Sequence, residues 1–278
     1  MIWSCRGRTF DLTQRVLVMG IVNITPDSFS DGGRYFEPAA AIEHARALIA
    51  EGADVLDLGG ESTRPGSSPV PADEQIRRLM PVIETLAAEG ACVSVDTSNA
   101  AVAERALTAG AEIVNDVTAL ADLAMPGVVA KAGAGLVLMH MRGNPLTMQD
   151  APRYEDATRE VREFLGTRMR VAMAAGVLEE RIAVDPGIGF GKKAEHSLEL
   201  IARLDEVAGL GRPVVLGASR KSFIGRLIEA EVHERLEGGL AAASIAVFQG
   251  ARIIRTHDVA QTAKAVRIAE IVARAKRV

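Results

Sequence analysis

Short apolar runs recur along the 278-residue chain and alternate with longer segments in which apolar residues return every three or four positions. The short runs predict buried β-strands, and the longer segments predict amphipathic helices. Eight runs qualify as strands: Val16–Ile24, Val55–Gly59, Cys92–Asp96, Ile113–Val117, Leu136–His140, Ile182–Asp185, Pro213–Gly217 and Arg252–Arg255. Strands that alternate with helices indicate βα units and a parallel sheet.

Helical periodicity marks most segments between the strands. After Pro38, apolar residues share one helical face until Gly52 ends the helix. A second helix ends before Gly90 and contains Pro81, which is expected to kink it. Helical patterns also cover Tyr154–Gly176, Phe223–Ala230, Gly238–Phe248 and Val259–Val278.

One phrase, a glycine followed by a small residue and a buried strand, is repeated along the chain. Its copies begin at Gly52, Gly110, Gly133 and Gly250. Five residues after the glycine, three copies carry a polar side chain: Asp57, Asn115 and Arg255. Polar residues at this fixed distance from the glycine favour a closed barrel, in which the strands point these side chains into the interior. A doubly wound open sheet is the rival, but it more often has five or six strands.

We therefore expect an α/β protein, a (β/α)₈ TIM barrel of the usual length for that fold. No linker or change of composition divides the chain, so residues 1–278 are expected to form a single domain. Residues 1–15 precede the first strand and are interpreted as a short β-hairpin that closes the bottom of the barrel.

Composition narrows the class of protein. Hydrophobic residues make up 48% of the chain and aromatic residues only 4%, which suits aliphatic strands buried on both faces. The net charge of −4, with both signs interspersed, argues against nucleic acid or a membrane surface as a partner. Cys5 and Cys92 are too few for a disulfide framework or a thiolate metal site. Without a signal-peptide core or a membrane-spanning stretch, a cytoplasmic location is expected.

Polar residues collect where the predicted strands end, whereas the strand starts are apolar. Barrel enzymes carry their active sites at the carboxyl ends of the strands, so this asymmetry indicates a site. The polar strand ends and loops are Asn23, Gly59–Ser67, Asp96, Asn115, His140, Asp185–Lys192, Gly217–Ser222 and Arg255–Asp258.

Each of these residues also has a structural interpretation. Asp96 and Asn115 could be helix caps or Asx turns, but a functional role is favoured because both end apolar runs. Asp116 and Ser98 are interpreted as structural. Asp185 ends a buried strand, where a carboxylate needs a partner or a ligand.

Anion-binding features lie at the last two strands. The segment Gly217–Ser222 leads from a strand into a helix, whose first N–H groups attract a carboxylate or phosphate. Arg255 and His257 are expected to point the same way and suit a pyrophosphate. The glycines of Gly187–Lys192 do not match a nucleotide motif and predict a tight turn. His44, His196 and His233 are interpreted as surface residues, whereas the role of His140 stays open.

Four longer motifs closely resemble those of the dihydropteroate synthase family. They are Gly20–Gly33 (GIVNITPDSFSDGG), Gly59–Gly66 (GGESTRPG), Asp185–Lys192 (DPGIGFGK) and Gly217–Gly225 (GASRKSFIG). The resemblance runs from the first predicted strand to the eighth and so covers nearly the whole chain. One departure is Thr256, where the family usually has an apolar residue, and its side chain is expected to point away from the ligand.

The resemblance implies that the chain condenses 6-hydroxymethyl-7,8-dihydropterin pyrophosphate with 4-aminobenzoate to give 7,8-dihydropteroate and pyrophosphate in folate biosynthesis. It also implies a homodimer, for which the Ala-rich segment Gly238–Phe248 and the C-terminal helix could supply an apolar interface. The residues implied to bind the pterin are Asp96, Asn115, Met139, Asp185, Phe190, Gly217 and Lys221. A carboxylate such as Asp185 can accept the two adjacent N–H donors of the pterin edge.

The resemblance further implies roles in catalysis. Asp96 would stabilise the pterin cation formed as pyrophosphate leaves, before the arylamine attacks. Pyrophosphate would be held by Asn23, Thr63, Arg255 and His257, with Mg²⁺ on Asn23 and on substrate phosphate. Aminobenzoate would lie against Ser219, Phe29, Thr63, Arg64 and Pro65, the last four from the loops Thr25–Gly33 and Glu61–Ser67. The implied catalytic residues are Asp96, Lys221, Arg255 and His257.

Two alternatives stay open from the sequence. A pterin-binding methyltransferase would share the pterin-binding Asp and Asn residues but should lack the Ser219–Lys221 phrase and the Arg255/His257 pair. A catalytically silent pterin-binding paralogue would not need the full set of Asn23, Asp96, Lys221, Arg255 and His257.

Overall fold

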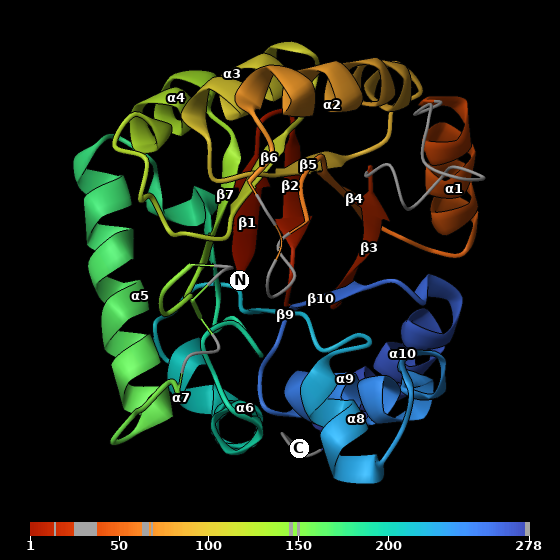
Figure 1. Cartoon of the computed structure of the whole chain (residues 1–278), viewed down its shortest axis with the longest axis vertical. Coiled ribbons are helices and arrows are strands. Elements are labelled where there is room, and N and C mark those ends of the chain that lie inside the picture. The colour runs from red at the N-terminus through yellow and green to blue at the C-terminus, as the bar shows by residue number, and fades with distance from the viewer. Residues whose placement is uncertain are drawn as a thin grey trace.

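Eight parallel strands form a barrel at the centre of the molecule (Figure 1). They are β3 (Leu17–Asn23), β4 (Val55–Gly59), β5 (Val93–Asp96), β6 (Ile113–Asp116), β7 (Gly135–Met139), β8 (Ile182–Asp185), β9 (Val215–Leu216) and β10 (Ile253–Thr256). The sheet order is β8-β7-β6-β5-β4-β3-β10-β9. A parallel bridge between Val184 of β8 and Val214, next to β9, joins the two ends of the sheet. The predicted (β/α)₈ barrel is therefore confirmed.

This computed structural model describes residues 1–13, 15–24, 38–62, 67, 69–144, 147–148 and 151–275. Helices surround the strands as an outer ring (Figure 1). They are α1 (Pro38–Ala50), α2 (Ala72–Ala88), α3 (Ala100–Thr108), α4 (Met125–Ala132), α5 (Ala157–Ala174), α6 (Ala194–Ala202), α7 (Leu204–Ala208), α8 (Ser222–Ile228), α9 (Leu236–Phe248) and α10 (Val259–Ala275). Short 3₁₀ turns lie at η1 (Glu179–Arg181) and η2 (Val232–Glu234).

The strands separate two hydrophobic layers because successive side chains point to opposite faces. The outer layer, which includes Leu56, Val114 and Ile254, packs against the helices. The inner layer, which includes Val55, Ile113 and Ile253, fills the lower part of the barrel. Along the barrel strands, the residue two positions after an inner-layer residue points into the barrel above it. The hydrophobic pattern therefore fixes which residues face the mouth.

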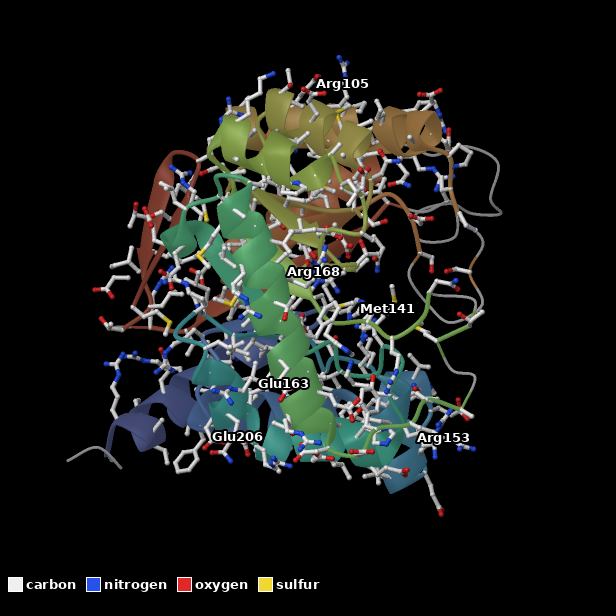
Figure 2. All side chains as sticks on the ribbon, turned by 90° about the vertical axis from the view of Figure 1, so that its left-hand side faces the viewer. Arg105, Met141, Arg153, Glu163, Arg168 and Glu206 are labelled. Atoms are coloured by element: carbon white, nitrogen blue, oxygen red, sulfur yellow. The ribbon has the colours of Figure 1, made fainter. Side chains whose placement is uncertain are left out.

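An antiparallel hairpin lies at the opposite end of the barrel from the mouth. Its strands are β1 (Ile2–Cys5) and β2 (Arg8–Asp11), which pair in register from Ile2–Asp11 to Cys5–Arg8. Trp3 is fully buried against the inner layer, and its Nε1 donates to the Arg181 carbonyl oxygen at 3.0 Å. Figure 2 shows the hairpin at one edge of the molecule and the loop residues Met141 and Arg153 toward the other.

Most predicted elements match the observed ones within two residues. The predicted strand Pro213–Gly217 is shorter, because only Val215 and Leu216 continue the ladder. Pro81 lies inside α2, but the kink predicted there stays a prediction. Among the described residues, no helix combines the length and the apolar character needed to cross a membrane.

Candidate active site

The inward-facing positions at the upper ends of the strands are mostly polar. Asp57, Asn115 and Arg255 each follow an inner-layer residue by two positions, as the repeated phrase predicted. Other site residues predicted from the sequence occupy the same phase at the mouth: Asn23, Met139, Asp185 and Gly217. The mouth therefore combines polar side chains from many strands above a closed apolar floor.

Arg255 links two carboxylates at the centre of this mouth. Its Nε donates to Asp57 Oδ2 at 2.6 Å, and its Nη2 donates to Asp96 Oδ2 at 2.7 Å. The Asn115 Nδ2 donates to the same Asp57 oxygen at 3.0 Å. The Asp57 side chain is 0% exposed and the Asp96 side chain 9%, so both charges depend on this guanidinium for compensation.

Three acceptor oxygens in this cluster have no donor. Asp57 Oδ1, Asp96 Oδ1 and Asn115 Oδ1 are buried, and no hydrogen bond reaches them from the part of the chain that the structure describes. An unsatisfied buried acceptor costs about 1–3 kcal/mol. A ligand rich in N–H donors would satisfy them.

The buried charges shift the pKa values of the cluster. Burial, helped by the charge of Asp57, raises the pKa of Asp96 to about 7 against the opposing charge of Arg255. Burial lowers the pKa of Arg255, but the charges of Asp57 and Asp96 outweigh it, so the net shift is upward. The guanidinium therefore stays charged while Asp96 can change its protonation state near neutral pH.

A second group of residues forms one wall of the mouth. The Asp185 Oδ1 accepts from the Gly187 backbone N–H at 2.7 Å, which orients the carboxylate. The Lys221 Nζ lies 3.8 Å from the centre of the Phe190 ring, a cation–π contact. A side chain at Gly187 would overlap the His140 carbonyl and crowd Met139, so the β8 loop packs directly against the end of β7.

The wall residues also have shifted pKa values. Burial raises the pKa of Asp185, and the Gly187 N–H and the charge of Lys221 oppose this shift. Burial, with the charge of Arg255, lowers the pKa of Lys221 to about 8. Lys221 is thus a half-buried cation over an aromatic ring rather than a solvated surface lysine.

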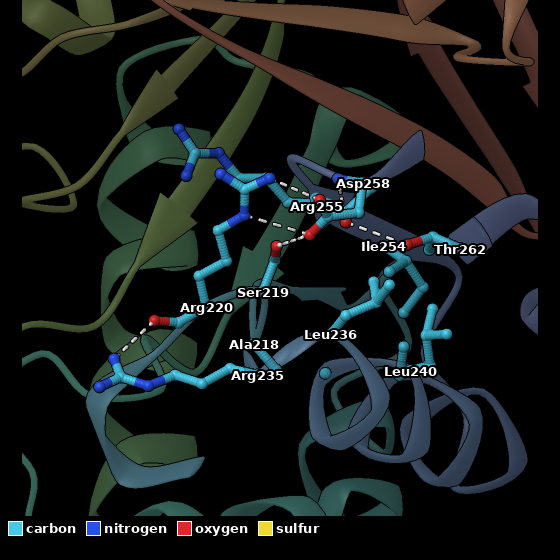
Figure 3. Close-up of a pocket in the computed structure, with 13 residues that line it drawn as sticks. Ala218, Ser219, Arg220, Arg235, Leu236, Leu240, Ile254, Arg255, Asp258 and Thr262 are labelled. Carbon is cyan, nitrogen blue, oxygen red and sulfur yellow. Dashed lines mark hydrogen bonds and ion pairs between the residues drawn. The ribbon is translucent and has the colours of Figure 1, made fainter. Parts of the chain in front are cut away.

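A hydrogen-bonded rim connects the β9–α8 loop with the end of β10 (Figure 3). The Ser219 Oγ lies 3.1 Å from His257 Nδ1 and 3.3 Å from Asp258 Oδ2. Arg220, in a left-handed backbone conformation with φ 58°, donates to both Asp258 oxygens at 2.5 and 3.3 Å. Ser219 is therefore held between two predicted anion-binding segments.

The pocket drawn in Figure 3 lies on the helix side of β10. Its lining includes Ile254 and Thr256, which point outward, and also Arg255 between them, whose guanidinium reaches into the barrel. Thr256 contacts Thr262 of α10 at 3.0 Å, so it points away from the mouth as predicted. The pocket therefore lies beside the hydrogen-bonded rim, whereas the buried acceptor oxygens without donors lie at the centre of the site.

Asn23 is the last residue of β3 and lies at the same mouth. A Cβ added to Gly59 of β4 would lie 3.9 Å from Asn23 Oδ1 and 3.7 Å from the Asp96 Cβ. Within the described residues, no group of three or more His, Cys, Asp or Glu side chains could hold a metal ion. A single amide oxygen of this kind suits Mg²⁺ that takes its other ligands from substrate phosphate and water.

Some residues named in the sequence predictions lie outside the described residues. For others, the structure shows a hydrogen-bond partner. Phe29, Thr63, Arg64 and Pro65 lie outside the described residues. The structural interpretation of Asp116 is confirmed, because its Oδ2 accepts from the Leu120 N–H at 2.7 Å. His140, left open by the sequence, is buried beside Lys192. His196 is half-buried, and its Nδ1 accepts from the Lys193 N–H at the start of α6, so it has a capping role that the surface interpretation missed.

Two groups of site residues were not identified from the sequence. Asp57 follows an inner-layer residue by two positions, as Asn115 and Arg255 do. This spacing could have identified Asp57 as a site residue, but it was not predicted as one. The Arg220–Asp258 ion pair spans two loops far apart in sequence, and no local pattern predicts it. His257 lies one residue beyond β10, so its ring contacts Ser219 while Arg255 reaches β4 and β5.

A (β/α)₈ barrel with charged side chains grouped at the carboxyl ends of its strands has the architecture of a barrel enzyme. Residues 19–257 match the model of the pterin binding enzyme family. The chain belongs to this family, among its dihydropteroate synthases.

Three relatives illustrate this membership. The dihydropteroate synthase of Escherichia coli (strain K12) is 43% identical over 272 residues, which cover 98% of this chain and 96% of that protein. The structure of the Yersinia pestis dihydropteroate synthase in a sulfonamide drug complex has a TM-score of 0.92 at 42% identity, with 99% of this chain and 100% of that chain covered. The Xanthomonas albilineans dihydropteroate synthase in complex with 7,8-dihydropteroate has a TM-score of 0.88 at 42% identity, with 98% of each chain covered.

Proposed function

We propose that this synthase joins 6-hydroxymethyl-7,8-dihydropterin pyrophosphate to 4-aminobenzoate and releases pyrophosphate. The observation that supports this most is the set of buried acceptors without donors beside Arg255, which fits a ligand with several N–H groups. The structure of the similar Xanthomonas albilineans enzyme was solved with 7,8-dihydropteroate, which is the product of the proposed condensation.

The pterin ring is proposed to lie against the Asp185 wall. Its 2-amino group and adjacent ring N–H would donate to the Asp185 carboxylate, and Asn115 Oδ1 would accept a further hydrogen bond. Lys221, held over the Phe190 ring, would donate to the ring's oxygen and nitrogen acceptors. Met139 and Gly217 would line the same pocket, since both face the mouth.

The carbon–oxygen bond to pyrophosphate is proposed to break first, with its electron pair leaving on the pyrophosphate oxygen. Asp96 would stabilise the resulting pterin methylene cation, because its charge is held in place by Arg255 before the cation forms. The amine lone pair of aminobenzoate then forms the new carbon–nitrogen bond. The proton that the amine loses goes to solvent or to the departing pyrophosphate.

Pyrophosphate is proposed to bind to Arg255, His257, Asn23 and, outside the described residues, Thr63. Arg255 can serve both Asp96 and an anion, since a guanidinium has five N–H donors. Asn23 Oδ1 would hold Mg²⁺ together with pyrophosphate oxygens. When bound, the ion would neutralise part of the leaving-group charge.

The aminobenzoate carboxylate is proposed to bind at Ser219. Its hydroxyl already faces His257 Nδ1 and Asp258, so it lies where the two loops meet. The remaining residues proposed for this substrate lie outside the described part of the chain: Phe29, Thr63, Arg64 and Pro65.

The finer assignments about the whole molecule also belong to this proposal. We propose that residues 1–278 act as one pterin-binding domain, because the hairpin packs into the same barrel that carries the site. We also propose a homodimer and a cytoplasmic enzyme with small-molecule substrates and no nucleic acid or membrane partner.

The proposal is tested by following pyrophosphate release from the pterin substrate with Mg²⁺ present. Release should require both the protein and 4-aminobenzoate, and it should stop when either is omitted. Aminobenzoate-independent release at the same rate would show hydrolysis instead of condensation and would contradict the proposal.

A further inference from the structure

Lys192 is a buried lysine that the proposed reaction does not use. It is 3% exposed, yet its Nζ has four acceptors within hydrogen-bond distance. They are His140 Nδ1 at 2.8 Å, the Phe190 carbonyl at 2.9 Å, the Gly187 carbonyl at 3.0 Å and the His140 carbonyl at 3.3 Å. A buried charge is tolerated only when it is paired and hydrogen-bonded, and these four acceptors meet that need.

Burial lowers the pKa of Lys192 well below its usual value, whereas the charge of Asp185 raises it and four acceptors surround the Nζ, and this geometry favours a charged ammonium facing a neutral histidine. An ammonium offers three donors and no acceptor, whereas a neutral amine would turn a lone pair toward one of these acceptors. Burial, and then the charge of Lys192, lowers the pKa of His140 to about 2. The imidazole is therefore neutral, with Nδ1 as the acceptor and the proton on Nε2.

The ammonium joins two loops that meet backbone to backbone. Gly187 and Gly191 have φ values of +66° and +61°, and a side chain on either would overlap the carbonyl of His140 or Arg142. Carbonyl oxygens that converge at such close range repel one another unless a donor lies between them. Lys192 supplies that donor for carbonyls from both loops.

The loop held in this way carries two parts of the proposed pterin pocket. The N–H of Gly187 orients the Asp185 carboxylate at 2.7 Å, and Phe190 places its ring 3.8 Å from Lys221. Lys192 bonds the carbonyls of both Gly187 and Phe190, so its charge fixes both ends of the turn.

We propose that Lys192 is a positioning residue for the pterin: it gathers the Gly187, Phe190 and His140 carbonyls and so fixes Asp185 and Phe190 against the ring. The inference rests on the proposed pterin site. It predicts that removal of this ammonium weakens pterin binding without an equal effect on aminobenzoate.

The test compares Lys192→Met with Lys193→Met, a neighbouring lysine whose side chain is 48% exposed. Calorimetry with the pterin pyrophosphate should show Kd raised about tenfold or more for Lys192→Met, on the order of one lost charged hydrogen bond or more, and unchanged for Lys193→Met. The KM for 4-aminobenzoate should stay within about twofold of the wild-type value, because Ser219 and its partners are untouched.

A pterin Kd within about twofold of wild type in folded Lys192→Met would overturn the inference, and so would equal weakening of both substrates. If Lys192→Met does not fold, His140→Phe removes one acceptor and keeps the edge-on packing against Phe164. This variant should weaken pterin binding about threefold, and unchanged affinity would also overturn the inference. If the wild-type protein does not bind the pterin, the proposed function fails rather than the role of Lys192.

Discussion

At the scale of single residues, the site is organised around buried charges that compensate one another. Arg255 lies between Asp57 and Asp96, and Lys221 lies over Phe190 near Asp185. Removing one member of such a cluster leaves an uncompensated charge, which is strongly destabilising. The same arrangement leaves acceptor oxygens free for a ligand, so the charges serve binding as well as folding.

Asp185→Asn is expected to weaken pterin binding by about 1.5–3 kcal/mol, or roughly ten- to a hundredfold. The amide oxygen can still accept from the Gly187 N–H, so the turn is kept. Its NH₂ group, however, meets the donors of the pterin edge and loses one charged hydrogen bond. Calorimetry with the pterin pyrophosphate measures the change, and unchanged affinity would remove Asp185 from its proposed role.

The pH dependence of kcat/KM for the pterin substrate should be bell-shaped. Asp96, with a pKa of about 7, must lose its proton to stabilise the cation, so activity rises as pH increases through that value. Lys221, with a pKa of about 8, must keep its proton to donate to the ring, so activity falls above that value. Lys221→Arg should remove the alkaline limb, whereas a limb that persists in this variant would exclude Lys221 as its source.

The sequence predicted the direction of a side chain wherever its position along a strand decides which face of the sheet it occupies. Asp57, Asn115 and Arg255 were predicted to point into the barrel, and they share one hydrogen-bonded cluster. The Arg255–Asp57 bond itself joins residues 198 positions apart, so no local pattern could predict it. Lys192 was read only as part of a glycine-rich turn, because its burial follows from the contact between two loops.

At the scale of elements, turns and caps decide where strands and helices begin and end. Only Val215 and Leu216 extend as β9, while the Pro213 carbonyl accepts from the Val184 N–H at 2.9 Å to close the barrel. At α3, Asn99 has extended backbone angles and its side chain accepts from the N–H groups of Ala101 and Val102. Such ends depend on single residues, so hydrophobic periodicity predicted the elements better than their limits.

Asn99→Ala is expected to lower the free energy of unfolding by about 1 kcal/mol, because two N–H groups at the start of α3 lose their acceptor. Turnover should be unchanged, since the cap lies outside the proposed site. Urea denaturation measures the difference. Asn99→Asp, which keeps a good capping residue, should match the wild type, and equal loss in both variants would rule out capping as the cause.

At the scale of the whole molecule, one end of the barrel is closed by the hairpin and the other carries the charged rim. The outer surface also has exposed apolar side chains on the neighbouring helices α9 and α10 (Figure 1): Ile245, Phe248, Ile268, Ile271 and Val272. These two helices correspond to the segments expected to form a dimer interface. The fold could be predicted from the sequence because the barrel follows from eight buried strands. The dimer interface could not be predicted in the same way, because an exposed apolar surface does not by itself identify what covers it.

The proposed homodimer makes a prediction about this apolar surface. Wild-type protein should sediment as a dimer, and Ile268→Glu combined with Ile271→Glu should shift it to a monomer because each change buries an unpaired charge in the interface. Leu123→Glu is the control, since Leu123 is 90% exposed and lies before α4, away from this surface. A monomeric wild-type protein, or an unchanged dimer in the double variant, would contradict the proposed interface.

The most direct test of the account is mass spectrometry of the product. Purified protein with 6-hydroxymethyl-7,8-dihydropterin pyrophosphate, 4-aminobenzoate and Mg²⁺ should form a compound with the mass of 7,8-dihydropteroate. The product should increase with protein concentration and depend on both substrates. No such product above the protein-free control, from a folded sample, would contradict the proposed condensation at the mouth of this barrel.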